Sequence, residues 1–142
     1  MPATSRRSRR RPARPRRLNV IDSSAWLAYF ADEPGADQFA AAIEDAAHSV
    51  VPAVCLYEVF KVIFRERGED EALQAAAVMQ QGRLVPLDAE LALAAAALSL
   101  EHRLPFADSV VYATARVVDA LVWTQDEHFA ALTDVRYVPK RP

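Results

Sequence analysis

Short apolar runs alternate along this chain with longer segments in which apolar residues recur at the spacing of an α-helix. Short runs bounded by polar or turn-forming residues are typical of buried strands. The pattern predicts strands at residues 18–22, 49–51, 83–87, 120–124 and 135–138. Because strands and helices alternate, we expect an α/β fold with a mostly parallel central sheet of four to five strands, flanked by helices.

The segments between the predicted strands have helical periodicity, and proline or glycine marks several of their ends. We expect helices at residues 23–31, 34–48, 52–67, 69–81, 88–102, 107–119 and 126–132. Pro34 stands at the start of the second helix, a position that proline tolerates, and Gly68 ends the third. Pro86 has no N–H to donate to a neighbouring strand, so residues 83–87 are predicted to form an edge strand.

Charge divides the chain into two regions. Residues 1–17 contain eight arginines and no acidic residue, whereas residues 18–142 contain nine Lys and Arg against 19 Asp and Glu, a net charge of −10. Pro12 and Pro15 interrupt any helix in the basic region, which has no apolar face to bury. We therefore expect a disordered tail at residues 1–17 and one domain at residues 18–142. The tail could be an electrostatic arm for nucleic acid or an extension that contributes little.

Composition excludes several classes of protein. The 142 residues are 52% apolar, enough for one sizeable core, but they contain no apolar run long enough to span a membrane and no apolar stretch of a secretory signal. We expect a cytoplasmic protein without membrane contact. The single cysteine, Cys55, excludes an intrachain disulfide and a multi-cysteine zinc site, and its apolar surroundings indicate a core position. Only three glycines are present, and none forms a phosphate-binding loop.

Four acidic residues stand where predicted strands give way to helices, or within the first turns of a helix: Asp22, Glu58, Asp108 and Asp126. Ligands of open α/β sheets bind outside the carboxyl ends of the strands. Asp22 and Asp126 follow two such ends, and the other two acids could lean over the same crevice. A set of carboxylates at one end of a sheet is suited to holding a divalent metal ion against a phosphate group.

Each of these acids also has a structural interpretation. Asp22, Asp108 and Asp126 lie at predicted helix starts, where aspartate is a favoured N-cap. Glu58 could pair with Lys61 or Arg65 on one face of its helix. Asp88 ends the strand at 83–87 just as Asp22 ends the first strand, and spacing alone does not distinguish the two.

Four separate pieces of the chain, in order, resemble the PIN-domain nucleases: DSSAWLAYF, VPAVCLYEVFKV, LPFADSVVYATA and VWTQDEHF. The match spans residues 19–138 and is most similar to the VapC-type ribonuclease toxins of toxin–antitoxin pairs. The resemblance implies a three-layer PIN-like sandwich in which Asp22, Glu58, Asp108 and Asp126 bind metal and Asp88 is a helix cap. It further implies a homodimer, an antitoxin that covers the active-site groove, and DNA binding only through that antitoxin. The basic tail is outside the family pattern.

All-oxygen ligands suit hard ions, so we expect Mg²⁺ or Mn²⁺ and a metal-dependent endoribonuclease that cleaves RNA phosphodiester bonds. Ser24 and Thr124 could orient the carboxylates or, equally, cap helices. The absence of clustered cysteine and histidine argues against zinc.

Other interpretations stay open. A metal-free ribonuclease would need two histidines, but we interpret His128, the histidine nearest Asp126, as a solvated helix residue. Trp26, Tyr29 and Phe30 are expected in the core or at a partner surface, and Lys61, Arg65 and Arg116 at the solvated surface. The main alternative function is a catalytically silent module that binds nucleic acid or protein. A phosphorylatable receiver domain fits less well, because no second acid follows Asp22.

Overall fold

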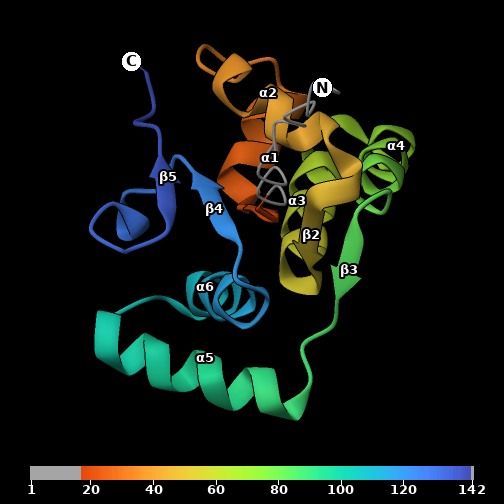
Figure 1. Ribbon diagram of the computed structural model, residues 1–142. Helices are drawn as coiled ribbons and strands as arrows, with labels where there is room; N and C mark the ends of the chain where they lie inside the picture. Colours follow the sequence, from red (N-terminus) through yellow and green to blue (C-terminus); the bar gives the residue numbers. More distant parts are fainter. Residues whose placement is uncertain (1–16, 142) are drawn as a thin grey trace, which may run out of the picture.

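Five parallel strands form a single sheet in the computed structural model, which describes residues 17–141 (Figure 1). The strands are β1 (Asn19–Ile21), β2 (Ser49–Pro52), β3 (Arg83–Val85), β4 (Leu121–Thr124) and β5 (Val135–Tyr137). Their order across the sheet is β3-β2-β1-β4-β5. The predicted α/β class and the edge position of the third strand are therefore confirmed.

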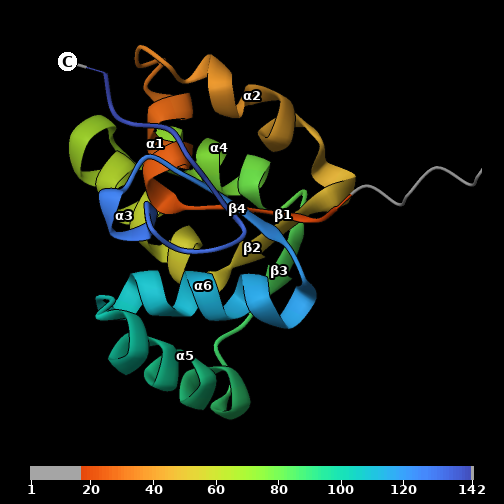
Figure 2. The ribbon, with the colours of Figure 1, turned by 60° about the vertical axis from the view of Figure 1, so that its left-hand side comes forward.

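Six α-helices and two short 3₁₀ turns connect the strands. They are α1 (Ser23–Phe30), α2 (Asp37–Glu44), η1 (Ala46–His48), α3 (Ala53–Arg67), α4 (Glu69–Met79), α5 (Ala89–His102), α6 (Phe106–Val118) and η2 (Glu127–Phe129). Helices α1 to α4 lie on one face of the sheet, and α5 and α6 lie on the other (Figure 2). This arrangement is the predicted three-layer sandwich.

The core lies on both faces of the three central strands. Val20, Val50 and Val122 are at most 1% exposed, which explains why these strands read as short uninterrupted apolar runs. Trp26 of α1 is 1% exposed and stacks on Phe30, so the first helix contributes to the core as expected. Cys55 is fully buried, which confirms its predicted place in the core.

The second helix begins later than its sequence pattern predicts. Residues 34–36 form a turn, and α2 starts at Asp37 rather than at Pro34. Gly35 has a φ of +90°, a conformation that a right-handed helix cannot contain, so the helix can start only after it. The short helix expected at residues 126–132 is present only as the single 3₁₀ turn η2, Glu127–Phe129.

The strand order places the ends of two distant segments side by side. The chain leaves β1 through α1 and α2 toward β2, whereas β4, on the other side of β1, is reached from β3 through α5 and α6 on the opposite face. In the β1–β4 pairing Ile21 lies opposite Trp123. Because connections diverge to opposite faces at β1, the carboxyl ends of β1 and β4 border the crevice in which such sheets bind ligands.

No helix within residues 17–141 is long and apolar enough to cross a membrane. The predicted tail at residues 1–17 lies outside the described residues, with the exception of Arg17, and its disorder stays a prediction. Arg17 forms ion pairs with Asp119, at 3.3 Å, and with Asp134, at 2.9 Å. These acids precede β4 and β5, so the chain enters the fold at the amino end of the sheet.

Candidate metal centre

Asp22 is the most buried of the four predicted acids, with 3% of its surface exposed. It follows β1 and caps α1, and its side chain accepts three hydrogen bonds on Oδ2: from Ser24 N at 3.3 Å, Ser24 Oγ at 2.7 Å and Thr124 Oγ1 at 3.0 Å. These donors leave Oδ1 to a ligand. Burial raises the pKa of Asp22 despite these bonds, so its charge is incompletely compensated.

Ser24 and Thr124 tie the ends of β1 and β4 together. Thr124 Oγ1 accepts a hydrogen bond from Asp126 N at 2.9 Å, and Ser24 Oγ accepts one from Gln125 N at 3.1 Å. The two hydroxyl oxygens are 3.2 Å apart. The hydroxyls therefore bond the Asp22 carboxylate and the backbone after β4, while the helix ends are capped by Asp22 and Asp126 themselves.

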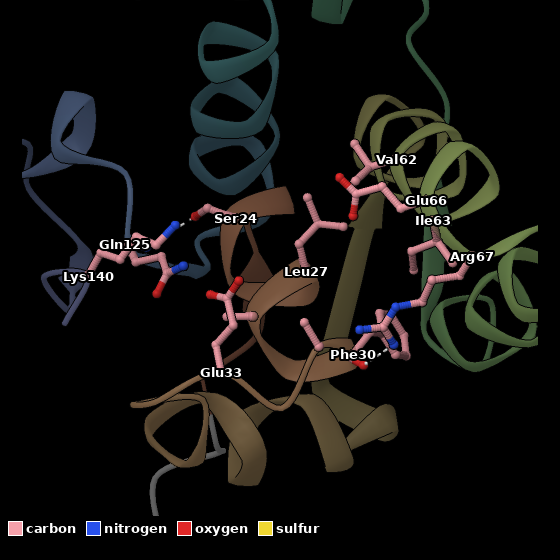
Figure 3. A pocket seen from close by; sticks show the side chains of 12 residues that line it. Ser24, Leu27, Phe30, Glu33, Val62, Ile63, Glu66, Arg67, Gln125 and Lys140 are labelled. Atoms are coloured by element: carbon pink, nitrogen blue, oxygen red, sulfur yellow. Dashed lines mark hydrogen bonds between the residues drawn. The ribbon is translucent and has the colours of Figure 1, made fainter. Parts of the chain in front are cut away.

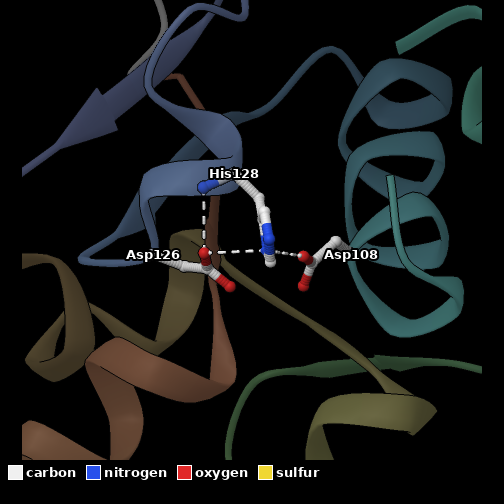
Figure 4. Close-up of side chains that lie close together, drawn as sticks. All are labelled: Asp108, Asp126 and His128. Carbon is white, nitrogen blue, oxygen red and sulfur yellow. Dashed lines mark hydrogen bonds and ion pairs between the residues drawn. The ribbon is translucent and has the colours of Figure 1, made fainter. Parts of the chain in front are cut away.

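Asp108, on α6, and Asp126, after β4, face each other with His128 between them (Figure 4). One ligand atom from each of the three residues lies within 4.8 Å of the others. Asp108 is in the first turn of α6, whose N-cap is Pro105, so it is not the helix cap that its position suggested. Burial, and then the negative charges of Asp126 and Asp22, raise the pKa of Asp108 from 3.8 to about 6.

His128 is exposed, as predicted, but it is not an isolated solvated residue. Its Nδ1 lies 2.9 Å from Asp108 Oδ2 and 3.1 Å from Asp126 Oδ1. The negative charge of Asp126 is the main cause that raises the pKa of His128. In the sequence, the contact with Asp126 is indicated only by the position of His128 two residues later. The interpretation of His128 as only a solvated helix residue is therefore incomplete, because the turn η2 folds the ring back over Asp126, the residue that caps it.

Glu58 points toward the same region from the second turn of α3 and is partly buried. Its Oε1 accepts a hydrogen bond from Ser23 Oγ at 2.8 Å, a contact between residues 35 positions apart that no local sequence pattern indicates. Burial raises the pKa of Glu58, and the charges of Asp22 and Asp126 raise it further.

The alternative partners predicted for Glu58 are engaged elsewhere. Lys61 Nζ lies 3.5 Å from the hydroxyl of Tyr57, and Arg65 pairs with Glu66 at 3.6 Å. Among residues 17–141 no lysine or arginine forms an ion pair with any of the four acids. The surface interpretation of Glu58 is therefore wrong.

Asp88 is separate from this cluster. It follows β3, the edge strand that β2 separates from β1, and its Oδ1 accepts a hydrogen bond from Leu91 N at 2.9 Å. Asp88 is thus the N-cap of α5, and the ambiguity between Asp22 and Asp88 is resolved by strand order.

The chemistry of the donor set fits a hard divalent cation. The candidate ligands are carboxylate oxygens with one neighbouring imidazole, and the pKa values of Asp22, Glu58 and Asp108 are all raised. The charged forms of these groups are therefore destabilised by burial and by one another. A bound cation would remove that destabilisation, and oxygen ligands favour Mg²⁺ or Mn²⁺.

A groove of about 340 Å³ lies between α1 and α3 (Figure 3). Ser24, which donates to Asp22, and Gln125, which precedes Asp126, line one side of it together with Lys140, and Arg67 lines the opposite side. Most of its remaining lining is apolar side chains of α1 and α3. The groove combines an aliphatic surface with scattered charges, unlike a uniformly basic nucleic-acid channel.

The fold and the site agree with comparisons to known proteins. Residues 20–135 match the family model of the PIN domain. VapC20 of Mycobacterium tuberculosis, described as a sarcin-ricin loop cleaving toxin, has a similar structure with a TM-score of 0.69 at 22% identity, covering 87% of this chain and 99% of that one.

Two further similar structures are complexes. One is a toxin–antitoxin complex from Klebsiella pneumoniae, with a TM-score of 0.70 at 18% identity, covering 83% of this chain and 95% of that one. The other is DNA-bound VapBC from Salmonella typhimurium, with a TM-score of 0.67 at 11% identity, covering 89% and 100%. A search of curated protein sequences finds no significant match. Because the family model covers most of the residues, the chain belongs to the PIN domain family.

Proposed function

We propose that this protein is an Mg²⁺- or Mn²⁺-dependent endoribonuclease and the toxin of a toxin–antitoxin pair. The observation that carries the proposal is the convergence of Asp22, Asp108 and Asp126 at the carboxyl ends of β1 and β4, with Glu58 close enough that the charges of Asp22 and Asp126 add to burial in raising its pKa. Family membership supports a nuclease, and the toxins among the similar structures support the toxin role.

In this proposal Asp22, Glu58, Asp108 and Asp126 hold the cation. When bound, Mg²⁺ or Mn²⁺ supplies Lewis acidity and positive charge to the phosphate under attack. Ser24 and Thr124 fix the rotamer of Asp22 through Oδ2, so that Oδ1 faces the ligand. Ser23 fixes Glu58 in the same way through Oε1. Thr124 also accepts a hydrogen bond from the backbone N–H of Asp126, so one hydroxyl links the positions of Asp22 and Asp126.

The decisive experiment is the mapping of cleavage ends across total cellular RNA after brief induction of the parent protein or of Asp22→Asn. We expect discrete cleavages in the parent, products that carry a 5′-phosphate, and loss of cleavage with Asp22→Asn or with EDTA. Products with a cyclic phosphate, formed in the presence of EDTA, would contradict the metal scheme. Binding of RNA without cleavage by the purified parent would favour the silent binding module.

We further propose that an antitoxin occupies the groove between α1 and α3 and covers the acids. An aliphatic groove suits a polypeptide, and the acidic crevice at its end suits an arginine from another chain. DNA would then be bound only through the antitoxin. The substitution Arg67→Glu, in the groove and nine residues after Glu58 along α3, is expected to weaken inhibition by a co-expressed neighbouring gene product and to leave cleavage intact. Equal inhibition of both variants would exclude this groove.

A homodimer completes the proposal. Leu93 and Leu100, seven residues apart on α5, are 74% and 86% exposed, and Phe106 at the start of α6 is 67% exposed. A self-association surface is one explanation for such an apolar patch. Light scattering is expected to give a dimer for the parent and a monomer for Leu100→Glu, while a monomeric parent would exclude the dimer.

A further inference from the structure

The imidazole of His128 lies within the acidic cluster of the candidate metal centre. Its ring stands between Asp108 on α6 and Asp126 after β4, with Nδ1 directed at one oxygen of each (Figure 4). We infer that His128 supplies a nitrogen ligand to the divalent cation, beside the carboxylates. This inference rests on the proposed function, because it extends the same metal centre.

The distances in this cluster match those between adjacent ligands of an octahedral ion. Ligand atoms about 2.1 Å from a metal and at right angles to each other are about 3.0 Å apart. Nδ1 lies 2.9 Å from Asp108 Oδ2 and 3.1 Å from Asp126 Oδ1. One ligand atom from each of the three residues lies within 4.8 Å of the others, so an ion among them would take the place of any proton on Nδ1 and reach all three after small adjustments of the side chains.

The backbone around His128 holds the ring in this position. The N–H of His128 donates to Asp126 Oδ1 at 2.9 Å, which closes η2 and brings the ring over the carboxylate that caps it. Asp126 is in turn held by Thr124 through its own N–H. The imidazole thus belongs to the same network as the acids, although 53% of its side chain is exposed.

A nitrogen ligand would change the choice of metal. Imidazole suits Mn²⁺ and the later transition ions better than Mg²⁺, which prefers oxygen ligands. With His128 as a ligand, the site is expected to bind Mn²⁺ much more tightly than Mg²⁺. Substitution of His128 would lower the affinity for Mn²⁺ by about tenfold or more, a typical cost of disturbing a metal site, and would change the affinity for Mg²⁺ much less.

Pulsed electron paramagnetic resonance of the Mn²⁺-loaded full-length protein tests this inference without any assay of cleavage. A histidine bound to Mn²⁺ gives a ¹⁴N coupling, which we expect in the parent and in the control His102→Asn. His102 lies on α5, beside Glu101. The coupling should disappear in His128→Asn, which preserves a polar group near the position of Nδ1 but removes the imidazole. Calorimetric titration of each variant with Mn²⁺ and Mg²⁺ gives the affinities.

The outcomes separate this inference from the proposed function. Tight Mn²⁺ binding that depends on Asp108 but shows no ¹⁴N coupling in the parent would overturn the role of His128 and leave the metal centre intact. A coupling that persists in His128→Asn would assign the nitrogen to another residue and also overturn it. Failure of the parent to bind Mn²⁺ or Mg²⁺ at all would overturn both proposals.

Discussion

Acidic side chains at the two ends of the sheet lie in opposite environments. At the amino end, Asp119 and Asp134 are exposed and share the guanidinium of Arg17, at 3.3 and 2.9 Å. At the carboxyl end, Asp22 and Asp108 are buried, and within residues 17–141 the acids there pair with no lysine or arginine but only with the imidazole of His128. At the amino end an arginine balances the negative charges of the acids. At the carboxyl end most of the negative charge is not balanced by a side chain.

This difference indicates which end is adapted to a ligand. Exposed ion pairs such as those of Arg17 contribute little to stability, and their charges are balanced without a ligand. Burying several carboxylates without a matching cation costs free energy, which appears here as raised pKa values for Asp22, Glu58 and Asp108. A site that is destabilised alone and stabilised by a cation is a characteristic of functional centres rather than of structural ones.

The largest expected effect is on cleavage. Asp108→Asn removes a negative charge from the carboxyl end, and the rate of RNA cleavage should fall by at least about 10²-fold, as when a group that stabilises transition-state charge is removed. Asp119→Asn is the matched control at the amino end. Asp119 has a φ of +54°, which asparagine also tolerates, so the fold is preserved. A comparable loss in both variants would show that the two ends are not functionally distinct.

The second prediction concerns stabilisation by metal. At a free Mg²⁺ or Mn²⁺ concentration 100 times the Kd, binding adds about 2.7 kcal/mol to the free energy of unfolding. For a domain of this size the Tm should rise by about 8 °C. Scanning calorimetry should find this increase in the parent and in Asp119→Asn, but not in Asp108→Asn. An equal increase in all three proteins would indicate that the ion binds elsewhere.

A third prediction follows from the pKa of Asp108, which is raised from 3.8 to about 6 in the folded protein. The folded state then holds a proton that the unfolded state releases, so this contribution to stability is present below about pH 4 and is lost as the pH rises through about 6. After allowance for screening by water, we expect a loss of about 1 to 2 kcal/mol.

Urea denaturation at pH 4 and pH 7 without metal measures this effect. The stability of the parent relative to Asp108→Asn should decrease between the two values. His128, whose pKa is also raised, acts in the same direction at higher pH, because the stability it contributes is lost as it deprotonates. A difference between parent and variant that is independent of pH would mean that Asp108 keeps an ordinary pKa.

The smallest effect is expected at the amino end. Arg17→Ala removes the ion pairs with Asp119 and Asp134, whose side chains are 94% and 48% exposed. Exposed pairs of this kind contribute about 0.2 to 1 kcal/mol and are weakened by salt. Urea denaturation should therefore show a small loss of stability at low salt that shrinks at 0.5 M NaCl, with unchanged cleavage. A loss of stability in Arg17→Ala larger than the pH-dependent change expected for Asp108 would contradict this ranking of the two ends.

Sequence determined the elements of this protein and the identity of its acids. Alternation of apolar runs with amphipathic segments fixed the α/β class, because a buried strand and a half-buried helix require different spacings of apolar residues. The cap Asp22 was recognisable since capping is a local interaction, complete within three residues. Resemblance to a known family then selected which acids belong together.

Only the tertiary structure decided which of these residues meet. The order β3-β2-β1-β4-β5 sets Asp22 beside Thr124 and leaves Asp88 at the sheet edge, and nothing local in the sequence specifies strand order. The contact of Ser23 with Glu58 joins residues 35 positions apart, and the contact of His128 with Asp108 joins two elements through one ring. Such contacts depend on how separate segments pack, whereas sequence periodicity reports only which face of each segment is buried.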